Sequence, residues 1–176
     1  LQQIANLGQQ LLFGGSFDPV HKGHIAMAKA ARAQLKCPSL FFIPANESPL
    51  KDDLIATGAQ RLRFLRAALR QTNFKISTIE LERKGPSFTI DTLKHFRKRF
   101  ARKRLYWLMG ADVYKSIERW RDSEKIRDAA TIVVVGRPGH PIKRKDPRDV
   151  ILSTRLSPWS SSQLRKSLAK GKLERS

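Results

Sequence analysis

The sequence predicts an α/β fold of the Rossmann-like, doubly wound type, with a mostly parallel sheet of five or six strands and helices on both faces. Two observations lead to this prediction. Short β-branched or aromatic runs alternate along the chain with longer amphipathic ones, as expected of repeated strand–helix units. The run Thr131–Val135 is apolar at nearly every position, which is typical of a strand that is covered on both faces.

The expected elements alternate in order along the chain. Strands are expected at Leu11–Phe13, Ser39–Ile43, Phe74–Ile79, Leu105–Met109, Thr131–Val135 and Val150–Ser153. Helices are expected at Gly23–Leu35, Ala59–Arg70, Phe88–Phe100, Asp112–Ile117, Ser123–Ala129 and Ser161–Ala169. In the second helix the apolar stripe includes Leu62, Leu65 and Leu69, and Arg61 is expected mostly off that stripe.

Ligands of such sheets bind outside the carboxyl ends of the strands, where the helices begin. This rule selects four junctions of the chain: Gly14–His24, Pro44–Lys51, Gly110–Asp112 and Ser157–Arg165.

Length and composition set the broad class of protein. The 176 residues are enough for one compact domain, expected over residues 1–176. Cys37 is the single cysteine, which excludes an intramolecular disulfide and favours a reducing, cytoplasmic location. No apolar run approaches the roughly 20 residues of a membrane-spanning helix. We therefore expect no membrane partner. The sequence does not indicate which oligomeric state the protein has.

The charge is strongly basic. Lys and Arg number 35 against 15 Asp and Glu, a net charge of +20 that indicates polyanionic partners such as nucleic acid, anionic lipid or phosphate-rich small molecules. Much of it lies in His95–Arg104 and Ile142–Arg148. Charge runs are usually solvated, so a solvated helix face and a solvated loop are expected. A basic nucleic-acid-binding module is the alternative, and it would bind with strong salt dependence.

The first junction has the composition of a phosphate site. Gly14 and Gly15 leave room for a ligand to approach the backbone, and Ser16 adds a hydroxyl. His21 and His24 follow at the expected start of a helix, three positions apart and therefore on one face. Free amides and the positive end of the helix dipole lie at the same point.

This junction, "GGSFDPVHKGH", resembles the (H/T)xGH signature of the nucleotidylyltransferase superfamily, and its form is similar to the nicotinate-nucleotide adenylyltransferase family. Further segments resemble that family in order over most of the chain: "IPANESPLK", "RKGPSFTIDTL", "WLMGADVYKSIERW", "VGRPGHP" and "SSSQLR". The resemblance implies that nicotinate mononucleotide attacks the α-phosphorus of ATP and that pyrophosphate leaves. It also implies Mg²⁺, held mainly by the phosphates of the substrates rather than by a protein metal site.

The resemblance implies these residue roles. The catalytic residues would be His21, His24 and Arg165, whose guanidinium is always charged and forks onto phosphate. ATP and its phosphates would be bound by Gly14, Gly15, Ser16, Lys51, Ser160, Ser161 and Ser162, the serines through an N-cap and free amides. Nicotinate mononucleotide would be bound by Phe88, Thr89, Asp112 and Trp120.

Several alternatives stay open. Phe88 and Trp120 are equally well interpreted as ordinary core, whereas Trp107, Trp159 and Cys37 are expected to be structural only. A related nucleotidylyltransferase could use nicotinamide mononucleotide, phosphopantetheine or a cytidine nucleotide instead. The chain departs from the family at Ser48 and Leu50, where Pro-Pro-His is frequent before the basic residue. It also ends soon after the segment "SSSQLR", so the C-terminal segment is expected to be shortened.

Overall fold

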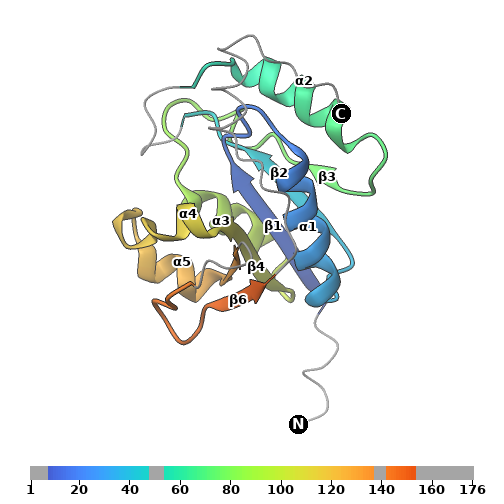
Figure 1. The fold of residues 1–176 in the computed structure, drawn as a ribbon. Helices are drawn as coiled ribbons and strands as arrows, with labels where there is room; N and C mark the ends of the chain where they lie inside the picture. The colour runs from blue at the N-terminus through green and yellow to red at the C-terminus, as the bar shows by residue number, and fades with distance from the viewer. Residues whose placement is uncertain (1–7, 48–53, 137–141, 154–176) are drawn as a thin grey trace.

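Six parallel strands form the centre of the molecule (Figure 1). The computed structural model describes residues 8–47, 54–136 and 142–153. The strands are β1 (Gln9–Gly15), β2 (Leu40–Pro44), β3 (Lys75–Ile76), β4 (Arg104–Gly110), β5 (Thr131–Gly136) and β6 (Val150–Ser153). They lie in the order β3-β2-β1-β4-β5-β6, and every neighbouring pair is parallel. The predicted fold class is confirmed, and β3 is shorter than the sequence suggests.

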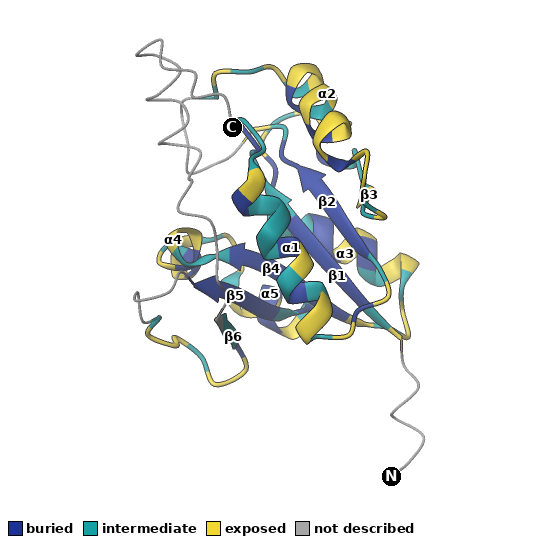
Figure 2. Cartoon of the chain, turned by 45° about the vertical axis from the view of Figure 1, so that its right-hand side comes forward, coloured by how far each residue is buried: buried dark blue, intermediate teal, exposed yellow. Residues whose placement is uncertain are grey.

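Helices cover both faces of the sheet, as Figure 2 shows. One layer holds α1 (Lys22–Gln34) and α2 (Gly58–Leu69). The other holds α3 (Thr89–Arg99), α4 (Ala111–Tyr114) and α5 (Ser123–Ala129), with the short 3₁₀ helix η2 (Ile117–Arg119) between the last two. The sixth expected helix, at Ser161–Ala169, lies outside the described residues.

Two apolar cores result, one on each face of the sheet. Ile132 and Val134 of β5 pack into the core beneath α3 to α5, whereas Val133 and Val135 pack into the core beneath α1 and α2. Successive side chains of a strand point to opposite faces, so a strand covered on both sides is apolar throughout. This accounts for the continuous apolar run that predicted a doubly covered sheet.

The buried face of α2 differs from the expected one. Arg61 is only 1% exposed, and it shares the buried stripe with Leu65 and Leu69, four and eight positions further on. The expectation that Arg61 lies off the stripe is therefore wrong. Its guanidinium donates to four backbone carbonyls, which offsets the cost of removing the charge from water.

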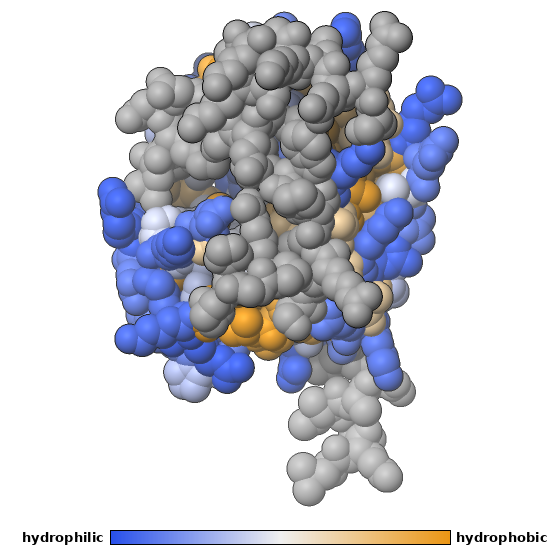
Figure 3. Space-filling view, in the orientation of Figure 1, coloured by the Kyte–Doolittle hydropathy of each residue, from blue (hydrophilic) through white to orange (hydrophobic). Residues whose placement is uncertain are grey.

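The surface agrees with the basic composition. Hydrophilic side chains cover both flanks of the molecule in Figure 3. Within the described ranges, no helix has the length and apolarity needed to cross a membrane.

Cys37 is 4% exposed, and burial raises the pKa of its thiol to about 11, in keeping with a structural cysteine.

Candidate active site

The site forms where the strand order changes direction. β1 pairs with β2 on one side and with β4 on the other, so the helices that follow β1 and β4 leave toward opposite faces of the sheet. Open α/β sheets bind ligands at this point. The junctions after β1, β2 and β4 all lie at this edge, and Gly15 is paired with Pro44 of β2. Three of the four expected junctions therefore meet there, and the fourth lies outside the described residues.

The two histidines of the first junction lie together. His21 is the N-cap of α1, and His24 is its third residue. Their ring centroids are 3.8 Å apart, which confirms that they share one face. The Nδ1 atom of His24 accepts the backbone N–H of His21 at 3.2 Å. Since Nδ1 is an acceptor there, the proton of the neutral imidazole is on Nε2, which makes Nε2–H the donor group of this side chain.

Aromatic packing holds the His24 ring in place. The ring centroids of Phe17 and Phe13 lie 5.2 and 5.9 Å from it, and Phe17 meets it edge to face at 77°. A half-buried imidazole with this support has little rotational freedom, which favours a fixed donor direction.

A side chain at either glycine of the junction would meet an aromatic ring. A Cβ atom on Gly14 would lie 2.2 Å from Cζ2 of Trp107, and one on Gly15 would lie 3.2 Å from Cζ of Phe17. The indole ring of Trp107 on β4 therefore occupies the space that a side chain at Gly14 would need. Contact of the Gly14 and Gly15 backbone and of Ser16 with phosphate remains a prediction.

Arg61 and Asp18 fix the loops around the histidines. Arg61 Nη1 donates to the carbonyls of Ser16 and Ala45, each at 2.7 Å, and so ties the end of β1 to the end of β2. The carboxylate of Asp18 accepts the N–H groups of Ile55 and Ala56 at 2.7 and 3.2 Å. Burial lowers the pKa of Arg61, and the charge of Asp18 opposes that shift. The sequence analysis did not predict this role; the 61, 65, 69 spacing indicates that Arg61 is buried but not which carbonyls it meets.

The residues expected at the pyridine end belong to three elements. Phe88 is the N-cap of α3, and Thr89 is its first residue. Asp112 lies exposed in α4 directly after β4, and Trp120 closes η2. Phe88 and Trp120 are half-buried and pack against the same core. Part of each ring therefore packs against the core, as the core interpretation expects. Contact of the remaining part with a substrate stays a prediction.

A buried polar network fixes the loop before α3. Thr92 donates to Glu80 at 2.6 Å and accepts from Arg83 at 3.0 Å. Ser87 accepts the backbone N–H of Asn46 at 3.0 Å, which links this loop to the end of β2. Burial raises the pKa of Glu80 despite these partners. The segment that resembles the family motif "RKGPSFTIDTL" therefore serves here to hold the start of α3.

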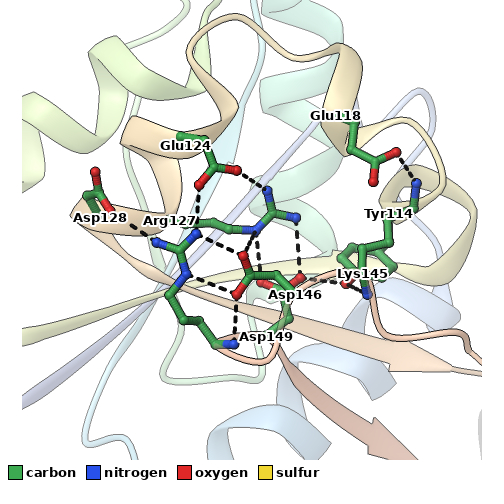
Figure 4. Close-up of polar contacts among 9 residues, drawn as sticks. Tyr114, Glu118, Glu124, Arg127, Asp128, Lys145, Asp146 and Asp149 are labelled. Atoms are coloured by element: carbon green, nitrogen blue, oxygen red, sulfur yellow. Dashed lines mark hydrogen bonds and ion pairs between the residues drawn. The ribbon is translucent and has the colours of Figure 1, made fainter.

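A second network fixes α4 and ties down the loop Ile142–Arg148, whose basic residues Lys143, Arg144, Lys145 and Arg148 are exposed, in agreement with the expected solvated loop (Figure 4). Asp149 has a fully buried side chain and accepts from Tyr114 Oη at 2.5 Å. Arg127 donates to both oxygens of Asp149 at 3.3 Å. Lys145 pairs with Glu118, and Arg148 with three carboxylates: Glu124, Asp128 and Asp146.

The remaining predicted site residues cannot be placed. Lys51, Ser160, Ser161, Ser162 and Arg165 lie outside the described residues. The basic run His95–Arg104 is described, and it ends at Arg104, the first residue of β4. It therefore reaches the amino edge of the sheet, at the opposite end from His21 and His24. Its expected solvation is consistent with the exposure of most of its charged residues.

Known proteins similar to this chain carry names of one kind of adenylyltransferase. The family described as cytidylyltransferase-like matches residues 12–167. A probable nicotinate-nucleotide adenylyltransferase of Thermus thermophilus is 35% identical over 161 residues, covering 92% of this chain and 87% of the relative. One of Aquifex aeolicus is 37% identical over 131 residues, covering 74% and 78%. The fold is similar to Plasmodium falciparum nicotinic acid mononucleotide adenylyltransferase complexed with NaAD, with a TM-score of 0.77 at 18% identity, covering 92% and 84%.

Proposed function

The chain belongs to the nicotinate-nucleotide adenylyltransferase family of cytidylyltransferase-like proteins, and from this membership we propose that it joins nicotinate mononucleotide to ATP. The products are nicotinate adenine dinucleotide and pyrophosphate, so the enzyme is a nucleotidyltransferase of NAD biosynthesis. The observation that carries the proposal is the pair of histidines at the start of α1, beside the change of strand order.

The reaction requires placement and charge stabilisation. A phosphate oxygen of the mononucleotide forms a bond to the α-phosphorus of ATP while the bond to the pyrophosphate oxygen breaks. Negative charge grows on the leaving oxygens, and donors aimed at them lower the barrier. The Nε2–H of His24 is such a donor, because its Nδ1 is already occupied. His21 and the first amides of α1 would add donors to the same phosphates.

Mg²⁺ would accompany ATP. Among the described residues, no three His, Cys, Asp or Glu side chains converge as a metal site. A hard cation that keeps water and phosphate oxygens as its ligands needs no such cluster of side chains. When bound, the ion would neutralise triphosphate charge. Arg165, Lys51 and the serines Ser160, Ser161 and Ser162 are proposed to hold the phosphates, as expected from the sequence.

The mononucleotide would lie at the other side of the junction. Asp112 is proposed to accept a ribose hydroxyl, and Trp120 to stack on the pyridine ring. Thr89 and the amides next to Phe88 would receive the nicotinate carboxylate at the start of α3. The contact of Arg121, the residue after Trp120, with the ring of Phe88 supports this placement, because it brings the end of η2 next to the start of α3.

The test is pyrophosphate release from ATP and Mg²⁺ with nicotinate mononucleotide. The variant His24→Ala should lose on the order of 100-fold or more in kcat, the usual cost of removing one donor to a developing charge. His95→Ala, an exposed histidine of α3, is the matched control and should retain activity. Thermal unfolding shows whether both variants fold. Full activity in His24→Ala would exclude the proposed mechanism. A nucleic-acid-binding module would instead release no pyrophosphate and would bind RNA regardless of His24.

A further inference from the structure

A guanidinium group lies over an aromatic ring at the pyridine end of the site. The Cζ atom of Arg121 is 4.7 Å from the ring centroid of Phe88. Phe88 is the N-cap of α3, whereas Arg121 follows Trp120 at the end of η2, so the contact joins two elements that are 33 residues apart in the chain. This stacking holds an otherwise exposed arginine at one place.

The geometry leaves the donors of Arg121 available. No described residue accepts a hydrogen bond from its guanidinium or forms an ion pair with it, and the N–H donors of a guanidinium lie in one plane. Those in-plane donors match the two oxygens of a carboxylate. The contact with Phe88 therefore positions the guanidinium, and no described group occupies the donors that would bind an anion.

The charge of Arg121 is not neutralised by the protein in the part of the chain that the structure describes. The acidic groups closest to it in sequence, Glu118 and Asp122, pair with Lys145 at 2.6 Å and with Lys125 at 3.1 Å. Asp91, in the first turn of α3 next to Phe88, pairs with Lys94 at 3.7 Å. No described carboxylate forms an ion pair with Arg121. The result is a fixed cation whose nearby acids already have partners.

We propose that Arg121 is a specificity-determining residue that selects a pyridine mononucleotide bearing a carboxylate over one bearing a carboxamide. The inference rests on the proposed function, because it assumes that the pyridine ring lies between Trp120 and the start of α3. A carboxylate gains a charge-assisted hydrogen bond from the guanidinium, whereas a neutral carboxamide gains much less. Nicotinate mononucleotide is therefore favoured over nicotinamide mononucleotide at this position.

The test compares both mononucleotides in the wild type and in Arg121→Gln. One measurement is the ratio of kcat/KM for nicotinate and nicotinamide mononucleotide, and the other is the ratio of their Kd values from calorimetry. We expect Arg121→Gln to reduce both ratios on the order of 10- to 100-fold, mainly through KM for nicotinate mononucleotide. Arg119→Gln removes an exposed arginine two positions earlier and should leave both ratios at the wild-type value.

Arg121→Lys separates charge from shape. Lysine keeps the charge but lacks the planar fork, so its ratios should fall between those of the wild type and of Arg121→Gln. Ratios in Arg121→Gln within twofold of those of Arg119→Gln would overturn the inference, as would a wild type that binds both mononucleotides equally. A wild type that binds nicotinate mononucleotide selectively but releases no pyrophosphate would overturn the proposed reaction, while the Kd ratios would still decide the role of Arg121.

Discussion

Gly14→Ala tests whether the first glycine of the junction is needed for packing or for a ligand. The new Cβ atom would lie 2.2 Å from Cζ2 and 2.5 Å from Cη2 of Trp107. Carbon atoms in contact lie about 3.5–4 Å apart, so more than an ångström must be regained. Trp107 is 2% exposed and lies in the core beneath α3 to α5, so a shift of its ring disturbs that packing. Overpacking of this kind costs about 1–3 kcal/mol, and the size of this overlap places Gly14→Ala at the upper end.

The lower backbone entropy of alanine in the unfolded chain offsets part of the cost of overpacking in Gly14→Ala. Alanine in a strand regains roughly 0.5–1 kcal/mol relative to glycine, so the expected net loss is about 2–2.5 kcal/mol. For a chain of this size that loss lowers Tm by roughly 5–10 °C. The measurement is urea unfolding together with a thermal scan. Gly110→Ala is the matched control, because its Cβ would meet only Cε of Met27 at an ordinary 3.6 Å.

A double variant isolates the cause. Gly14→Ala combined with Trp107→Phe should be less destabilised than the sum of the two single variants, since the smaller ring vacates the space that the new methyl group needs. If Gly14→Ala were as stable as Gly110→Ala while its KM for ATP rose, the packing explanation would be refuted, and approach of the phosphates would be the reason for this glycine.

Two further predictions concern buried groups. Arg127→Met leaves the carboxylate of Asp149 buried, with the Tyr114 hydroxyl as its remaining side-chain hydrogen-bond donor. The free energy of unfolding in urea should fall by about 3–5 kcal/mol, and adding Asp149→Leu should recover much of that loss. A stability of Arg127→Met within about 1 kcal/mol of the wild type would contradict the role assigned to Arg127. Burial raises the pKa of the Cys37 thiol to about 11, so a thiol reagent at pH 8 should label it far more slowly in the folded protein than in urea, and equal rates would contradict its burial.

Local pattern was enough to predict most of the fold. The alternation of strand and helix patterns and the run Thr131–Val135 predicted a doubly covered parallel sheet, because periodicity reports which faces of each element are buried. The spacing of His21 and His24 likewise predicted that their rings share a face, since positions three apart on a helix are neighbours. Both properties depend only on residues that are close in sequence.

Tertiary structure alone decided the contacts between distant segments. Nothing near Gly14 in sequence shows that Trp107, on the neighbouring strand β4, fills its missing side chain. The guanidinium of Arg61 is buried because the ends of β1 and β2 present carbonyls to it, and helical periodicity does not report such partners. The contact of Arg121 with Phe88 is of the same kind, because it joins residues that are far apart in the sequence. Sequence patterns record which side of an element is buried, whereas the partner it meets there is fixed only when all the elements are packed together.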